Sequence, residues 1–540
     1  MTNHKGKTMI MTIVDRIGNW NPQLFREWKG RLTGRNLASA TVLSLLGQLI
    51  IGMVLQSKFP IPKPSNADAD WVTHSPYCTG ESRSPYSFQC LPDGLGSWQL
   101  DWKDFWLDMA TWSSVAILVA LVLGGVYLLI DDLAKEQKRG TLNFIRLSPQ
   151  SSESILIGKI LGVPVLVYFA VALVLPMHIV SVIAAGLPID TLFRFYLLAA
   201  AGCGVFYNVA LLFAFLEGSA WSGLLLAGFC NLPYLLAFRL MFPENKNHSW
   251  SELQWFSLPL GKQPDLLQVF VFCNLILWTF WLWQAVNRRF RNPSATLLSK
   301  RQSYYAMACF QVLLLGLTLT HDRGYNGLET LYGFSIVNLV AFVILTAALS
   351  PQRQTVQDWA RYHHLQGNRR SAVREWIFGE KSPVLVAIAL NLAITGIIWI
   401  PGILFLGAKN HEAAIVALLA TANIIWICAA ISQVTLLLKN RRRQAFAIAS
   451  VAATIGLPPI LLLVVSAGSA SVSELWMFAT FGWGLLDVNS IGFSISTILL
   501  GFLGQVCVMA ALSWQLNRIL HKVGDSDTKK LLQERRSLPS

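Results

Sequence analysis

The chain has 540 residues, of which 54% are hydrophobic and only 13% are charged. Soluble domains contain about a quarter charged residues, so the composition excludes a soluble, a disordered or a collagen-like protein. The net charge of +14 leaves nucleic acid and acidic lipid as partners to consider until its distribution along the chain is known.

The N-terminal region, 1–37, is mostly polar and basic and lacks the pattern of a cleavable signal peptide. Within it, Leu24, Trp28 and Leu32 recur at every fourth position, while Arg26 falls on the opposite face. This pattern is typical of a helix that lies in the membrane interface. We therefore expect a cytoplasmic N-terminus with an interfacial helix.

Twelve apolar runs are long enough to cross a hydrocarbon core, which takes about 20 helical residues. They are too long and continuous for barrel strands, so each is expected to be a helix. The runs span residues 38–56, 109–130, 155–178, 191–215, 220–242, 267–286, 304–320, 331–349, 383–407, 413–437, 444–467 and 489–514.

Lys and Arg collect on one side of these runs. With the N-terminus inside, 32 of the 43 Lys and Arg residues fall in inner segments and eight fall in outer loops. Inner loops of membrane proteins carry this excess, so both termini are expected to be cytoplasmic. The positive charge is then a signal of topology, and nucleic acid is not expected as a partner.

Three short motifs occur twice, in the same order in each half of the chain. The paired segments are 164–167 and 383–386, 251–253 and 473–475, and 283–284 and 514–515. Such echoes indicate a duplication, and halves of six spans each have the same orientation. The sequence therefore predicts an all-α polytopic membrane protein with 12 transmembrane helices in two parallel six-helix repeats. The expected halves and the cytoplasmic C-terminal tail are 38–300, 301–516 and 517–540.

Eight cysteines are present, and no two of them have the C-x-x-C spacing of a metal site. Six lie inside apolar runs, where they are expected to be packing residues. Cys78 and Cys90 share one long outer loop, with Gly80 and Pro85 between them. In an oxidising envelope compartment we expect these two to form a disulfide, and we expect no metal site.

The sequence offers no energy source for transport. No Asp or Glu lies within the twelve runs, which disfavours proton coupling through a buried acid. The phosphate-binding pattern G-x-x-x-x-G-K-[ST] is absent too, so the chain is not expected to be an enzyme. Lys159, near the cytoplasmic end of the third run, is expected to extend its ammonium group to the interface. Uphill transport would need energy from another subunit.

The cytoplasmic segment after the second run has the pattern of a helix, a break and another helix. The second span is expected to continue into the cytoplasm as far as Gly140, and a short amphipathic turn with Leu142 follows. Ser148 and Pro149 have the pattern of the next helix start. From spacing alone, this segment is either a charged connector or a surface on which a soluble partner docks.

The pattern Glu136-x-x-x-Gly140-Thr141, followed by Pro149 and a Gly-Lys pair, resembles the permease subunits of ABC transporters of the type-two exporter family. Segment 21–32 adds to the likeness, and the basic stretch after the sixth run resembles cyanobacterial members. In that family the loop after the second span docks on the ATPase. The resemblance implies that the coupling residues are Glu136, Arg139, Gly140, Thr141, Leu142 and Arg146.

The same resemblance implies a function and its partners. The chain would be the permease subunit of an ATP-driven exporter and would form the substrate pathway. Separately encoded ABC-type ATPase subunits would bind ATP and Mg²⁺, and this chain would hold no cofactor. Membrane lipid would surround it, and a further permease or accessory subunit is left open. The expected location is the bacterial inner membrane, with the thylakoid membrane as the alternative. The loop 350–382 of the second half lacks the Glu-x-x-x-Gly-Thr pattern, so its coupling to an ATPase stays open.

Two other classes of function are left open by the sequence. A secondary transporter of the six-plus-six facilitator type shares the parallel repeat, but the missing intramembrane carboxylates disfavour it. A membrane-embedded enzyme acting on lipid would need a convergent cluster of His, Asp or Glu at the membrane face, and the sequence does not reveal one.

Overall fold

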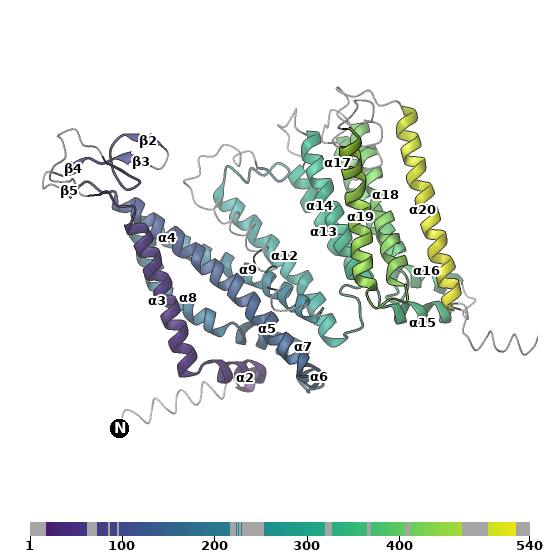
Figure 1. The fold of residues 1–540 in the computed structure, drawn as a ribbon, viewed down its shortest axis with the longest axis horizontal. Coiled ribbons are helices and arrows are strands. Elements are labelled where there is room, and N and C mark those ends of the chain that lie inside the picture. The colour runs from purple at the N-terminus through teal and green to yellow at the C-terminus, as the bar shows by residue number, and fades with distance from the viewer. Residues whose placement is uncertain are drawn as a thin grey trace, which may run out of the picture. The chain divides into compact units, whose positions relative to one another are not determined.

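The computed structural model describes residues 18–61, 73–84, 87–93, 97–216, 253–318, 327–363, 369–405, 411–466 and 495–524, together with Gly223, Leu225 and Gly228. Helices account for most of these residues, as Figure 1 shows. The chain divides into two compact units, the first formed by Met1–Lys246 with Gln268–Arg291 and the second by Asn247–Leu267 with Asn292–Ser540.

The first unit is built from helices of very different length. They are α2 (Pro22–Arg31), α3 (Gly34–Gln56), α4 (Trp102–Val119), the π-helical turn η1 (Ala120–Gly124), α5 (Gly125–Lys138), α6 (Thr141–Arg146), α7 (Ser152–Gly162), α8 (Val165–Ala184), α9 (Ile189–Phe215) and α12 (Pro264–Arg291).

The core of this unit lies where α5 packs on α9. Gly125 lets the two helices approach, since a Cβ there would lie 2.2 Å from the hydroxyl of Tyr207. That hydroxyl donates to the carbonyl of Leu121 at 2.9 Å. The backbone N–H of Gly125 already donates to this carbonyl at the end of the π turn, and the Tyr207 hydroxyl is a second, buried donor to it. One tyrosine therefore stabilises both the turn and the helix pair.

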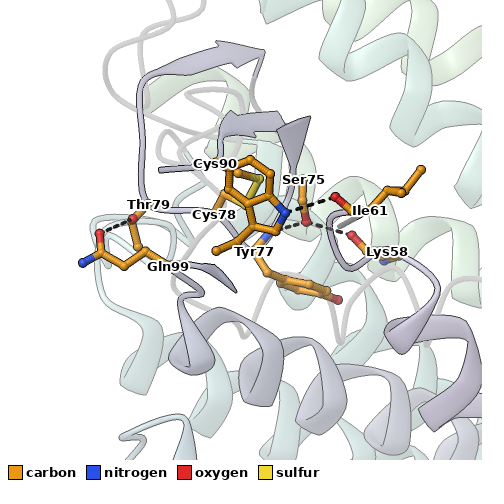
Figure 2. Close-up of a disulfide and its surroundings, with 9 residues drawn as sticks. Lys58, Ile61, Ser75, Tyr77, Cys78, Thr79, Cys90 and Gln99 are labelled. Atoms are coloured by element: carbon orange, nitrogen blue, oxygen red, sulfur yellow. Dashed lines mark hydrogen bonds between the residues drawn. A yellow bond between two sulfur atoms is a disulfide. The ribbon is translucent and has the colours of Figure 1, made fainter. Parts of the chain in front are cut away.

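Five short strands form the connection between α3 and α4. They are β1 (His74–Ser75), β2 (Ser82–Ser84), β3 (Ser87–Gln89), β4 (Pro92–Asp93) and β5 (Ser97–Trp98), in a sheet of order β1-β3-β2 and a β4-β5 pair. Cys78 and Cys90, the two cysteines that the sequence analysis pairs, form a disulfide here (Figure 2). Tyr77 packs beside it against Phe59 and Phe105, each with ring centroids 5.7 Å away.

The second unit is a helical bundle of the same general kind. Its helices are α13 (Lys300–Thr318), α14 (Gly327–Leu349), α15 (Arg353–His363), α16 (Arg369–Phe378), α17 (Leu385–Phe405), α18 (His411–Leu436), α19 (Arg443–Ser466) and α20 (Ile495–Gly524).

The described helices identify a multi-pass membrane protein. Nine of them are long and apolar enough to cross a membrane, and a tenth span results if the pair Ser335–Leu349 and Arg353–Arg361, bent by 66°, is one span. The seventh predicted run, 304–320, lies largely in α13, which is not among these nine. Most of the fifth, 220–242, lies outside the described residues.

The third predicted run, 155–178, is wrong at its start. The structure divides it into α7 and α8, with the break at Pro164. Proline has no backbone N–H to donate and its ring crowds the preceding turn, so the helix ends although the residues on both sides are apolar. The candidate span begins at Val165, and α7 with Lys159 precedes it.

Candidate functional site

Lys159 lies at the centre of a buried charged cluster that joins three helices of the first unit. Its side chain is only 2% exposed. Its ammonium group donates one hydrogen bond to a carboxylate on α2 and two to carboxylates on α5. The acceptors are Glu27 Oε1 at 2.8 Å, Asp132 Oδ2 at 2.6 Å and Glu136 Oε1 at 2.7 Å. We call these four residues the Lys159 cluster. The expectation that Lys159 extends to the interface is therefore wrong, because three carboxylates hold it inside.

Helix α2 reaches this cluster because α7 presents glycine to it. A Cβ on Gly158 would lie 2.9 Å from the backbone nitrogen of Leu24, and one on Gly162 would lie 2.6 Å from Cβ of Glu27. Two glycines four residues apart lie on one helix face and allow close packing. Asn21 completes the contact, since its side chain caps α2 at Leu24 N and donates to the carbonyl of Ser154 at 2.8 Å.

Two arginines of α2 balance the remaining charge. Arg26 donates to Glu136 at 2.9 Å, and Arg31 pairs with Asp132 and, at 3.3 Å, with Glu27. With Lys159 this gives three cations facing three carboxylates. That α2 lies in the membrane interface stays a prediction, but its side chains are not arranged as the sequence pattern predicts. Leu24 is buried against α7, Arg26 contacts α5 instead of facing away, and Leu32 follows the last residue of α2.

The electrostatics of the Lys159 cluster favour its charged form. Burial opposes ionisation of the Glu27 carboxyl, but Lys159, Arg31 and Arg26 outweigh burial and lower its pKa. Burial also opposes the charge on Lys159, but the surrounding carboxylates outweigh it and raise the pKa of the ammonium group. The carboxylate oxygens lie within 4.8 Å of one another, a spacing that would suit a metal ion, but the Lys159 ammonium group bonds to all three.

The end of α5 turns sharply into α6. Gly140 adopts φ +73° there, a left-handed conformation that glycine takes without steric cost. The hydroxyl of Thr141 donates to the carbonyl of Glu136 across the turn at 3.2 Å. Leu142, on α6, is buried, while Arg139, just before the turn, is exposed.

Helix α6 therefore has a buried side and an exposed side. Leu142 and Ile145 join the hydrophobic core, and Arg146 lies over the ring of Phe290, 5.5 Å from its centroid. On the outer side, Phe144 is 80% exposed, and Leu147, which directly follows the last residue of α6, is 85% exposed. Two large apolar side chains on a short polar-flanked helix form a surface suited to a partner.

The structure brings together only some of the predicted coupling residues. Glu136 belongs to the Lys159 cluster, and Arg146 lies over the ring of Phe290, so neither charged side chain points outward to a partner. The other three, Gly140, Thr141 and Leu142, form the turn and the buried side of α6. The predicted site residues did not include Glu27, Asp132, Phe144 or Leu147, although the last two lie in the amphipathic turn expected after Gly140. Asp132 and Glu136 lie four residues apart on one helix face, and a lysine in an apolar helix requires counter-charges. Those two signals point to the cluster.

The loop 350–382 of the second unit, expected from the sequence to be the counterpart of this segment, is organised differently. The rings of Trp359 on α15 and Trp376 on α16 pack edge to face at 4.9 Å between centroids. Lys300 is buried and donates to the Trp376 carbonyl at 2.9 Å and to Ser382 Oγ at 2.6 Å. Burial lowers the pKa of Lys300 to about 8. This segment thus combines an aromatic pair with a lysine bonded to neutral oxygens.

Comparisons with known proteins provide no relative. No family model, no curated protein and no solved structure matches the chain. Its function therefore has to be inferred from its own residues.

Proposed function

We propose that the chain is the membrane-spanning permease subunit of an ATP-driven ABC exporter. A separately encoded ATPase docks on α6, binds ATP and Mg²⁺, and drives movement of the helices that line the substrate pathway. The side that carries α2 and α6 is cytoplasmic, and the disulfide-closed connection between α3 and α4 is on the outer side.

The exposed face of α6 carries this proposal. Phe144 projects from α6 and Leu147 directly follows its last residue, while Leu142 and Ile145 fix the helix on its other side. Gly140 sets its direction, and α5 connects it directly to a membrane-spanning helix. A force applied to α6 therefore reaches the bundle through a packed, hydrogen-bonded junction. Figure 1 supports the sidedness, since α2, α6 and α7 gather at one end of the first unit and the strands lie at the other.

The packing of helices supports two parallel repeats of six spans, twelve in all. In the first unit α3 packs on α8 and on α4, and α5 packs on α9. In the second unit α13 packs on α17 and on α14, and α14 packs on α18. The pairs follow the same chain order, as a duplicated six-helix unit requires.

Photocrosslinking from α6 tests the proposal. Phe144 is replaced by p-benzoylphenylalanine in the native cells, and the adduct formed on illumination is identified by mass spectrometry. The expected adduct is one polypeptide that contains a G-x-x-x-x-G-K-[ST] phosphate-binding loop.

Purified complexes provide the functional measurement and its control. Phe144→Asp places a charge in the proposed contact and should lower co-purifying ATP hydrolysis more than tenfold. Leu438→Asp introduces the same charge at another exposed leucine, after α18, and should leave it unchanged. An adduct without an ATP-binding motif, or full ATP hydrolysis in the Phe144 variant, would contradict the proposal.

A further inference from the structure

The second unit contains a cavity between α14, α17 and α18, three helices that lie together in Figure 1. Its volume is about 60 Å³. On the same measure a water molecule needs about 10–15 Å³, so the space is several times larger than one water. All of its described walls belong to this one bundle, near the middle of α17 and α18.

The walls of the cavity select an uncharged ligand. Most of the lining is apolar, from side chains such as Phe342, Leu392 and Ile425, and none of the lining residues that the structure describes is charged. An ionised group would lose its hydration there without gaining a counter-charge. An apolar body, in contrast, would gain contacts along its whole length.

One wall offers hydrogen bonds at a fixed position. Gln311 Nε2 donates to Asn338 Oδ1 at 2.7 Å, and Asn338 Nδ2 donates back to Gln311 Oε1 at 3.2 Å. Trp399 Nε1 fixes the same Gln311 oxygen at 2.8 Å. Each amide nitrogen carries two protons, and the second proton of Asn338 has no acceptor among the described residues. Thr395 donates its own proton to the carbonyl of Asn391 at 3.0 Å, so its oxygen can still accept.

The mouth of the cavity opens sideways through the bundle. Leu419 at the lining is 44% exposed, and Gly396 and Ile400 beside it are partly exposed. They belong to α17 and α18, and both helices are candidate membrane spans. A lateral opening between two spans meets the acyl chains of the bilayer, so the molecules able to enter come from the lipid phase.

We propose that this cavity binds an uncharged amphiphile from the bilayer, with a long apolar body and a hydroxyl oxygen. The oxygen enters first, accepts from Asn338 and donates to Thr395, while the apolar body fills the mouth between α17 and α18. This site goes beyond the permease assignment. It requires no ATPase and no movement, and it stands if that assignment fails.

The test uses the purified chain in lipid nanodiscs and a photoreactive probe. The probe is hexadecanol with a diazirine and an alkyne in its chain. Labelled peptides should map to 392–400 and 418–425, and excess unmodified hexadecanol should reduce this labelling at least fivefold. The matching alkane, without the hydroxyl group, loses both hydrogen bonds and should label these peptides at least about fivefold less, the value of one such bond.

Two variants with one control locate the site. A Cβ on Gly396 would meet only Ile400 Cδ1, at 3.8 Å, so Gly396→Leu can place a side chain at the mouth without moving the backbone, and it should reduce labelling at least fivefold. Gly456→Leu adds the same group to α19, where a Cβ meets open space, and should change nothing. Thr395→Val keeps the shape, removes the hydroxyl group and should reduce the preference for hexadecanol over the alkane.

Three results would overturn the proposal. One is labelling spread evenly over all lipid-facing helices and unaffected by Gly396→Leu, as expected for annular lipid contact alone. Another is equal labelling by a palmitate probe of the same length, since the cavity should reject a carboxylate. The third is an unchanged hexadecanol preference in Thr395→Val.

Discussion

Removing the ammonium group of Lys159 should release α2 from the first unit. In Lys159→Met the three carboxylates keep only Arg26 and Arg31 as cations, so one negative charge is left without a partner. Glu136 is the most affected, because its Oε2 already lacks a hydrogen-bond partner among the described residues. Breaking a buried ion pair by removing one partner costs about 3–5 kcal/mol. Because two guanidinium groups remain, we take the lower end, about 3 kcal/mol.

Hydrogen exchange measures this loss where it occurs. A destabilisation of about 3 kcal/mol should speed exchange of the α2 amide hydrogens roughly a hundredfold, with a much smaller effect on α9. Lys135→Met is the matched control, because Lys135 is 61% exposed and, among the residues that the structure describes, pairs only with Asp131. Exposed pairs contribute about 0.2–1 kcal/mol, so that variant should differ little from the parent chain. If the two methionine variants exchange equally at α2, the Lys159 cluster does not hold this helix in place.

Three further predictions concern the same junction. The docking of α2 should be strongest at intermediate pH. The pKa of Glu27 is lowered, so its contribution to stability is present above the ordinary pKa of 4.5 and is lost as pH falls through the folded pKa. The pKa of Lys159 is raised, so its contribution is present below the ordinary pKa of 10.5 and is lost as pH rises through the folded pKa. Limited proteolysis of α2 across pH measures both losses, and a cleavage rate independent of pH would refute them. Gly158→Ala should separate α2 from α7 and lower the apparent Tm. Gly30→Ala, whose Cβ meets nothing within 4 Å, should leave the apparent Tm unchanged or raise it slightly. Equal shifts of the apparent Tm in the two variants would count against close packing of α2 on α7. Gly140→Val should cost about 1–2 kcal/mol, since φ is +73°, and should lower co-purifying ATPase activity while the membrane helices stay folded, as far-UV circular dichroism would report; unchanged activity would mean that the turn does not orient α6.

Most of the helical architecture is predictable from the sequence, because an apolar run of about 20 residues leaves few alternatives in a membrane. The break at Pro164 was missed because hydropathy is continuous across it, while the cause is a single absent N–H group. The turn at Gly140 is a local feature, and glycine at a helix end is a signal that sequence alone carries.

The Lys159 cluster is a different kind of feature. Glu27 and Lys159 are 132 positions apart, and no local pattern identifies which carboxylate a buried amine will meet. Its pairing depends on how closely α2 approaches α7, which the two glycines of α7 determine through packing. The exposure of Phe144 and Leu147 likewise depends on which face of α6 the core covers.

Helices α4 and α5 are joined through η1 into one continuous helix, Trp102–Lys138, of 37 residues. At about 1.5 Å per residue its length is about 55 Å, well beyond a hydrocarbon core of about 30 Å. It begins beside the disulfide-closed strands and ends at the turn into α6. If this helix stays straight, a displacement of one end tilts the whole helix and moves the other end as well. Only a bend within the helix would prevent this. The π turn, where the Leu121 carbonyl accepts from both the Gly125 N–H and the Tyr207 hydroxyl, is the segment in which such bending would be least costly, since kinks in helices are found at π turns.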